Sequence, residues 1–218
     1  MSRPRGLEDV IDRLPVTQKA LAYAQRQHAG QRCSFSRAPF IDHPLEVGWL
    51  LYRAGASDRV VAAGVLHDTV EKTSSDEADL RGCFGPGIAR MVMAVSEDKA
   101  LGGYTRRKAA LRGQVAAAGP EALSIFAADK ISKVRELRRT ISARRCGGRQ
   151  PEASLLRPRR IAHYRSCLGL LDEVMGPPRA LVEQLRGELG RLEGVLPPGD
   201  SKTQLPQESY LGAVAPIG

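Results

Sequence analysis

The chain has 218 residues, of which 42% are hydrophobic and 5% aromatic, and it carries a net charge of +9. That length and hydrophobic content exclude a disordered polymer and a pair of large domains, and they suit one sizeable folded domain. Abundant Ala, Leu, Arg and Glu, with few aromatic residues, favour helices over sheets, so we expect an all-α protein.

Neither a membrane anchor nor a secretory leader is expected. The longest apolar runs, such as residues 60–66, fall far short of the roughly 20 residues that a spanning helix needs. The first residues are charged and lack the apolar core of a signal peptide. The four cysteines are widely spaced and form no Cys-x-x-Cys pair, so we expect free thiols in a reducing cytoplasm.

Helix-forming segments follow one another from residue 16, with Gly and Pro at many of their ends. We expect helices over residues 16–30, 44–55, 59–73, 88–97, 104–118, 120–141, 158–175 and 179–194, with a loop over 147–151. Residues 1–15 are then an N-terminal extension and residues 16–195 the folded domain. Residues 196–218 are rich in Pro, Gly, Ser and Gln, which predicts a disordered tail.

Two apolar runs end in ionisable residues. The segment 60–66 has almost no polar face, which predicts a deeply buried helix, and His67 and Asp68 follow it directly. Asp129 likewise follows the apolar run 125–128. Burying such groups without partners costs several kcal/mol. A metal ion bound by these three residues and His43 would satisfy all of them together.

Two imidazoles and two carboxylates form a ligand set that suits Mn, Fe, Zn, Co or Mg. An ion with further coordination positions can lower the pKa of a bound water and polarise phosphorus. Each residue also has an ordinary explanation by itself. A single buried His is usually hydrogen-bonded in the core, and Asp129 could be a partner for Lys130.

Positive charge is concentrated between Lys130 and Arg165, where twelve Lys and Arg stand against two Glu. Such a patch attracts phosphorylated small molecules, nucleic acid or acidic lipid, although a solvated helix face has the same composition. Tyr164 is the only aromatic residue in the patch, so stacking platforms for bases are lacking. We therefore expect a small phosphorylated partner rather than nucleic acid or a membrane.

Several motifs together resemble the hydrolase domain of Rel/SpoT stringent-response enzymes and their single-domain relatives, the small alarmone hydrolases of the HD superfamily. The motifs are Gly30-Gln31-Arg32, Pro39-Phe40-Ile41-Asp42-His43-Pro44, Leu66-His67-Asp68-Thr69-Val70-Glu71-Lys72-Thr73, Phe84-Gly85 and Ala127-Ala128-Asp129-Lys130. The resemblance covers about residues 16–175. It implies an HD-domain helical bundle that binds Mn(II) and removes the 3′-pyrophosphate of guanosine tetra- and pentaphosphate, giving GDP or GTP and pyrophosphate.

The resemblance also implies roles for individual residues. The metal ligands would be His43, His67, Asp68 and Asp129. Glu71 matches the first acid of a Glu-Asp pair that handles the attacking water, and it lies four residues after His67, on the same face of a continuous helix. The substrate-binding candidates that the resemblance implies are Arg32 on the guanine, and Lys99 and Lys130 near the phosphates. By their position in the same basic region, Lys133 and Tyr164 are further candidates, which the resemblance does not supply.

The sequence departs from the family pattern at positions where the family recognises its substrate and positions the attacking water. Lys72 replaces the second acid of the Glu-Asp pair, and a lysine with an ordinary pKa of about 10.4 cannot accept a proton there. As a catalytic-site residue it could bind phosphate, pair with Asp68, or point to water. Lys133 replaces an asparagine, Cys33 a basic residue, and the segment 34–38 lacks the usual Lys-x-Gly-x-Pro pattern. All four metal ligands remain, which suggests altered substrate choice or a slower rate.

Three functions stay open. The first is a Mn-dependent hydrolase of guanosine alarmones. The second is a hydrolase of another phosphorylated nucleotide, such as an adenine alarmone or the 2′-phosphate of NADPH. The third is a catalytically weak nucleotide-binding regulatory module. A synthetase domain is excluded because too few residues follow residue 175, and a homo-oligomer stays open.

Overall fold

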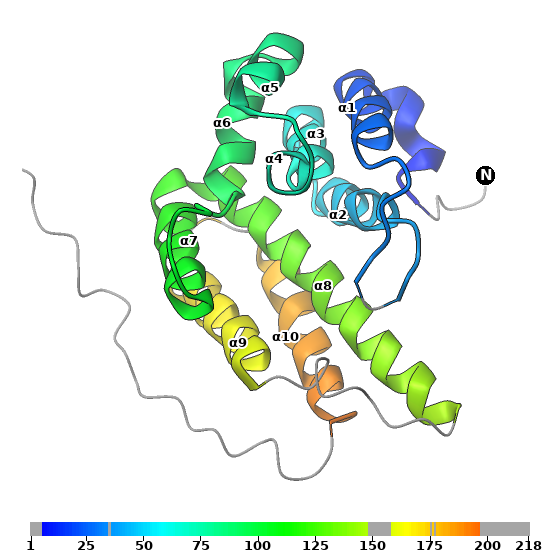
Figure 1. Ribbon diagram of the computed structural model, residues 1–218, viewed down its shortest axis with the longest axis vertical. Coiled ribbons are helices and arrows are strands. Elements are labelled where there is room, and N and C mark those ends of the chain that lie inside the picture. The colour runs from blue at the N-terminus through cyan, green and yellow to red at the C-terminus, as the bar shows by residue number, and fades with distance from the viewer. Residues whose placement is uncertain (1–5, 35, 148–157, 175, 177, 197–218) are drawn as a thin grey trace, which may run out of the picture.

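The structure of the chain is a computed structural model that describes residues 6–34, 36–147, 158–174, 176 and 178–196 (Figure 1). Over these ranges all regular structure is helical apart from one isolated bridge between Arg32 and Pro39. The expected all-α class is therefore confirmed. The tail expected over 196–218 and the loop expected over 147–151 lie outside the described residues, except for Leu196 and Gly147.

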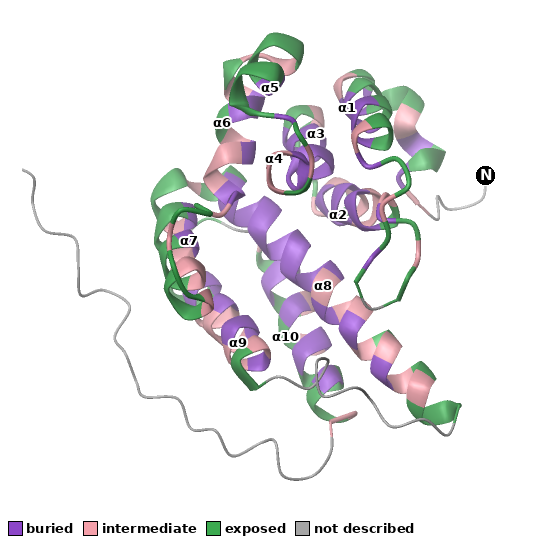
Figure 2. Cartoon of the chain, in the orientation of Figure 1, coloured by how far each residue is buried: buried purple, intermediate pink, exposed green. Residues whose placement is uncertain are grey.

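The N-terminal part of the molecule packs around a buried central helix. The short 3-10 helix η1 (Glu8–Arg13) precedes α1 (Pro15–Gln27), α2 (Asp42–Arg53) and α3 (Asp58–Leu66). Every residue of α3 from Val60 to Leu66 is buried, as its apolar run predicts (Figure 2). Leu7, Val10 and Leu14 are also buried, so the segment expected as an extension contributes side chains to the core.

Two glycines allow α2 and α3 to lie close together. A Cβ on Gly48 would lie 2.7 Å from Leu7 Cδ2 and 2.9 Å from Val65 Cγ2, and one on Gly64 would collide with Leu51. Real side chains do not tolerate such contacts in a close-packed core. The glycines therefore let the start of α2 and the end of α3 meet, and His43 and His67 lie at those two ends.

The single helix expected over residues 59–73 is wrong, because the chain turns at His67 and Asp68 and resumes as α4 (Thr69–Lys72). His67 Nδ1 donates to the backbone oxygen of Gly64 at 2.7 Å, and Thr69 Oγ1 donates to that of Leu66, also at 2.7 Å. Side chains thus bind carbonyls that a continuous helix would pair with backbone N–H groups. At this break the adjacent side chains of His67 and Asp68 point toward the same place in the protein interior.

The middle of the chain forms three further helices. They are α5 (Glu77–Phe84), α6 (Pro86–Val95) and α7 (Tyr104–Ala118). The sequence interpretation missed α5, although Asp76 and Asp79 form a reciprocal capping box at its start. Helix α6 begins two residues earlier than expected, and α7 has the expected bounds.

The long helix α8 (Pro120–Cys146) runs through the molecule, with α9 (Pro158–Glu173) and α10 (Arg179–Glu193) packed against it (Figure 1). Every residue from Ala122 to Ser132 is buried, so this part of α8 is surrounded on all sides (Figure 2). That stretch includes Asp129 and Lys130, which therefore need partners inside the protein. Within the described residues, no helix has the length and apolar character that crossing a membrane requires.

Candidate metal centre

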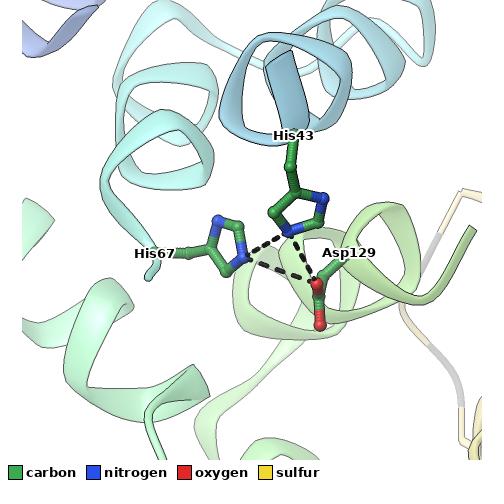
Figure 3. Close-up of side chains that lie close together, drawn as sticks. All are labelled: His43, His67 and Asp129. Atoms are coloured by element: carbon green, nitrogen blue, oxygen red, sulfur yellow. Dashed lines mark hydrogen bonds and ion pairs between the residues drawn. The ribbon is translucent and has the colours of Figure 1, made fainter. Parts of the chain in front are cut away.

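Four ionisable side chains from three parts of the fold converge on one buried point. His43 comes from the first turn of α2, His67 and Asp68 from the break between α3 and α4, and Asp129 from the middle of α8. His43 Nε2 lies 3.2 Å from both His67 Nε2 and Asp129 Oδ1, and His67 Nε2 lies 3.4 Å from Asp129 Oδ1 (Figure 3). Asp68 Oδ2 lies 3.5 Å from His43 Nε2 and 3.4 Å from His67 Nε2. All four residues are buried.

The partners of the two rings indicate where their protons lie. His67 Nδ1 faces a backbone oxygen, so it must donate. His43 Nδ1 lies 2.9 Å from Ser132 Oγ, whose own hydrogen goes to Glu46 Oε2, so this Nδ1 also donates. Each neutral imidazole then has its lone pair on Nε2. When both rings are neutral, two lone pairs face one another at 3.2 Å and cannot form a hydrogen bond, but both can bind a cation.

Two buried carboxylate oxygens at the same point lack a well-directed hydrogen bond. Among the described residues, no donor makes one to Asp68 Oδ2 or Asp129 Oδ1, although Lys133 Nζ lies 2.8 Å from Asp129 Oδ1. Unsatisfied buried oxygens are costly, and in folded proteins they call for a specific explanation. A divalent cation between these oxygens and the two Nε2 atoms supplies one, and the nitrogen and oxygen donor set suits Mn(II) and its neighbours. The residues present therefore fit a metal ion.

Lysines surround the carboxylates. Lys130 Nζ lies 2.6 Å from Asp129 Oδ2, and Lys133 Nζ lies 2.8 Å from Asp129 Oδ1. Burial acts to raise the pKa of Asp129, but these two ammonium groups outweigh it and hold that pKa well below the ordinary value. The pKa of Asp68 is likewise held low, against burial, chiefly by Lys133. Both carboxylates are thus ionised, as metal ligands must be.

The two histidines differ in basicity. Burial lowers the pKa of His43 below its ordinary value. Burial acts in the same direction on His67, but the adjacent Asp68 and Asp129 outweigh it and raise its pKa to about 9. In the metal-free protein a proton on His67 can therefore partly replace the charge of a cation.

The candidate catalytic residues lie at the edge of this centre. Glu71 Oε1 accepts a hydrogen bond from the backbone N–H of Glu97 at 2.7 Å, and Lys99 Nζ donates to the backbone oxygen of Glu71 at 2.6 Å. Because the helix breaks at His67, the expectation that Glu71 shares a continuous helical face with it does not hold. Lys72 Nζ lies 3.8 Å from Asp68 Oδ2 and 4.8 Å from the ring centre of Phe40. The pairing with Asp68 is one of the three alternatives left open for Lys72.

The substrate-binding candidates fall into two groups. Lys130 and Lys133 contact the carboxylate of Asp129 directly, and Lys99 holds the segment that contains Glu71. Arg32 instead lies in the exposed loop before α2, where its Nη1 donates to the backbone oxygen of Arg37 at 3.3 Å. Tyr164 is buried on α9, with its ring centre 5.7 Å from that of His163. Neither of these two is among the side chains gathered at the metal centre.

A hollow of about 560 Å³ opens beside His43, between α2, α8 and the loop that precedes α2. Its polar lining includes Asp42, Glu46, Ser132, Glu136 and Arg139. An outer hollow of about 1090 Å³ shares Ser36, Arg139 and Thr140 with it and adds Arg37 and Arg144. The two hollows therefore adjoin on the side of His43 where Ser132 and Glu46 lie, and of the four converging residues only His43 lines either of them. The outer hollow is basic.

Comparison with known proteins identifies the family. Residues 20–161 match the HD domain. The chain belongs to the HD-domain family. The matched range contains all four converging side chains, and α10 lies outside it.

Relatives of this HD domain include nucleotide-processing enzymes. The chain is 35% identical over 139 residues to a GTP pyrophosphokinase of Streptomyces coelicolor, which covers 62% of the chain but 16% of that protein. It is 36% identical over 126 residues to the human guanosine-3′,5′-bis(diphosphate) 3′-pyrophosphohydrolase MESH1, covering 56% of the chain and 69% of that protein. The chain thus spans about a sixth of the first relative and just over two thirds of the second.

Solved structures share the fold of this HD domain. One, described as a metazoan ortholog of SpoT that hydrolyses ppGpp, superposes with a TM-score of 0.68 at 24% identity and covers 90% of the chain and 100% of its own length. Another, lmo0812 from Listeria monocytogenes, has a TM-score of 0.57 at 28% identity and covers 71% of the chain and 96% of its own. The helical bundle is therefore that of known HD proteins.

Sequence reasoning missed polar residues that lie next to the candidate ligands of this HD domain, on the side of His43 away from the other ligands. Ser132 binds both His43 and Glu46, and Ser132 and Glu46 each lie three residues after a candidate ligand in their own helix. Residues three apart share a helical face, so this spacing was a usable signal. Arg135 and Glu188 continue the contacts toward α10, and no sequence signal joins residues so far apart in the chain.

Proposed function

We propose that this HD domain is a divalent-metal-dependent phosphohydrolase of polyphosphorylated nucleotides. The leading reaction is removal of the 3′-pyrophosphate from guanosine tetra- or pentaphosphate. The observation that carries the proposal is the convergence of two ionised carboxylate oxygens, which accept no well-directed hydrogen bond, with two imidazole Nε2 atoms inside a buried site. The name of the human relative, a 3′-pyrophosphohydrolase, supports the choice of reaction.

The metal, Mn(II) or a similar ion, would be held by His43, His67, Asp68 and Asp129. Such an ion supplies a water of lowered pKa and polarises a phosphoryl group. Glu71 is the carboxylate available to orient the attacking water and accept its proton. The backbone N–H of Glu97 holds this side chain in position.

The surrounding cations favour an anionic substrate. Lys72 and Lys133 place ammonium groups beside the ligand carboxylates, where phosphate oxygens of a substrate can replace the carboxylates as their partners. Next to the centre, the hollow beside His43 adjoins an outer hollow whose lining includes Arg37 and Arg139, which can attract a further anionic group of the substrate. A substrate with phosphates at more than one position would contact both the lysines at the metal centre and the arginines of the outer hollow.

A second candidate is hydrolysis of a different phosphorylated nucleotide, such as an adenine alarmone or the 2′-phosphate of NADPH. The observation that favours it is Lys72, whose ammonium group pairs with Asp68 where the Rel/SpoT pattern has an acid. A cation at this point alters which phosphate arrangement is accepted and removes one proton acceptor.

The test is a nucleotide panel with Mn(II), the purified chain, and products identified by ion-exchange chromatography. We expect pyrophosphate and GDP from guanosine tetraphosphate, and a faster reaction with Lys72→Asp. If Lys72→Asp abolishes turnover, Lys72 contacts the substrate and the second candidate replaces the first. If neither protein acts on any nucleotide, the chain is a nucleotide-binding module and the hydrolase proposal is wrong.

A further inference from the structure

A chain of hydrogen bonds begins at the ring of His43 on the side away from the metal centre. Its Nδ1 donates to Ser132 Oγ at 2.9 Å, and Ser132 Oγ donates to Glu46 Oε2 at 2.7 Å. A serine hydroxyl has one hydrogen and a carboxylate only accepts, so the direction of donation is fixed by chemistry. This arrangement leaves Nε2 as the only atom of His43 that can bind a cation.

The chain continues through an arginine to the C-terminal helix. Arg135 Nη1 donates to Glu46 Oε1 at 2.6 Å, and Arg135 Nε donates to Glu188 Oε1 at 2.9 Å. Arg135 therefore bridges two carboxylates, one on α2 and one on α10, from its place on α8. Both carboxylates of the bridge are fixed in orientation by the planar guanidinium group.

Glu188 is an unusual residue to find in this position. It is buried at 3% exposure, and Arg138 Nε and Arg191 Nη2 each lie 3.1 Å from its carboxylate in addition to Arg135. Burial acts to raise its pKa, but Arg191 and Arg135 outweigh it and lower the pKa to about 2, so the group is ionised. A buried ionic cluster of this kind is often no more stabilising than apolar packing, which leaves its purpose open.

We propose that the contacts from Ser132 to Glu188 form a positioning network that holds His43 with Nε2 directed at the metal. Helix α10, which lies outside the HD-domain match, is thereby part of the support of the metal centre. The network comprises Ser132, Glu46, Arg135 and Glu188. This inference rests on the proposed role of His43 as a ligand. Partners that orient a ligating histidine are typically worth about 10- to 100-fold in metal affinity.

The experiment measures Mn(II) affinity of the metal-stripped full-length chain by calorimetry, together with the His43 tautomer by ¹⁵N NMR. Ser132→Ala removes the acceptor for Nδ1, and Glu46→Gln removes the negative charge from the relay if the first variant fails to fold. Glu188→Gln tests the far end. Glu183→Gln is the matched control, because Glu183 lies on α10 too but is exposed, and its partners there are Arg179 and Arg186.

We expect Ser132→Ala to weaken Mn(II) binding about 10- to 100-fold and to mix the His43 tautomers. Glu188→Gln should weaken Mn(II) binding several-fold, and Glu183→Gln should leave it unchanged. The double variant of Ser132→Ala and Glu188→Gln should weaken binding by less than the product of the two single effects, because both substitutions act through the same network. If Ser132→Ala or its substitute Glu46→Gln binds like wild type, the network does not position His43. If Glu188→Gln lowers the melting temperature but matches Glu183→Gln in affinity, the α10 part is only structural. A wild-type chain that binds no metal would instead overturn the proposed function.

Discussion

Two buried histidine clusters lie beside α8, and they differ in a way that separates a metal centre from a polar core. The first is the convergence of His43 and His67 with two carboxylates. The second lies between α7 and α9, where Arg112 Nη1 donates to His163 Nδ1 at 3.2 Å and Cys167 Sγ lies 3.5 Å from the same nitrogen. Both contain buried nitrogens, so burial of histidine alone does not indicate a ligand.

The difference lies in the unsatisfied acceptors. In the described part of the chain, Asp68 Oδ2 and Asp129 Oδ1 of the first cluster accept no well-directed hydrogen bond, whereas His163 Nδ1 accepts one from Arg112. In the first cluster, His43, His67 and Asp129 offer three potential ligand atoms close enough together to hold an ion. Burial, with Lys130 nearby, lowers the pKa of His163 to about 2, and burial raises that of Cys167 to about 11. At neutral pH the side chains of His163 and Cys167 are therefore both uncharged.

The sharpest separation of the two clusters comes from Asp129→Asn. We expect it to abolish Mn(II) binding, because it removes an anionic ligand and leaves Lys130 and Lys133 to repel the cation. His163→Gln should bind the metal like wild type. Metal content after dialysis, measured by elemental analysis, checks both variants. Equal loss of metal in the two variants would remove the distinction between the clusters.

Glu71→Gln tests whether the chemistry depends on the first cluster and its rim. The amide oxygen can still accept from the backbone N–H of Glu97, so the fold and metal affinity should persist. Loss of the proton acceptor should lower turnover at least about a hundredfold. Steady-state rates and calorimetry on the same preparation measure the two effects separately. Turnover close to wild type would remove Glu71 from the mechanism.

The pH dependence of metal binding should reflect the raised pKa of His67. Below about pH 9 the metal-free chain holds a proton on His67 that the metal must displace, so apparent affinity should rise about tenfold per pH unit from neutral pH toward 9. Titrations at several pH values, corrected for buffer binding, measure this slope. An affinity independent of pH in that window would mean that His67 is already neutral or is not a ligand.

The second cluster should make the free energy of unfolding depend on pH. The pKa of His163 is about 2 when folded and about 6.5 when unfolded, so the unfolded chain takes up a proton first. Its contribution is present above about pH 6.5 and is lost as pH falls, at about 1.4 kcal/mol per unit. His163→Gln should remove that slope between about pH 6.5 and 5, as urea unfolding can measure. Parallel curves for the variant and wild type would contradict the account.

The sequence predicted most helices, and two apolar runs that end in ionisable residues singled out His67, Asp68 and Asp129, while the resemblance to Rel/SpoT hydrolases completed the set of candidate ligands with His43. The break at His67 was not predictable from periodicity, since it depends on side chains that capture the carbonyls of Gly64 and Leu66. Helix α5 escaped because, apart from Leu80, its residues are exposed or half-buried and show no strong apolar stripe.

The support of the site was harder still to foresee. Ser132 and Glu46 are 86 positions apart, and Arg135 and Glu188 are 53 apart, so only the packing of α2, α8 and α10 reveals their contacts. The basic segment starting at Lys130 also looked like a uniform patch in the sequence. In the structure, Arg135 and Arg138 bind Glu188, and Arg165 binds Glu193. Part of the positive charge of this segment therefore forms ion pairs with glutamates of α10.

The most direct test of the metal centre is a crystal structure of the chain grown with Mn(II), with anomalous scattering used to locate the ion. We predict one anomalous peak within coordination distance of His43 Nε2, His67 Nε2, Asp68 Oδ2 and Asp129 Oδ1. The His163 and Cys167 cluster in the same crystal should show none. Density for an ion at that second cluster, or none among the four predicted ligands, would contradict the account.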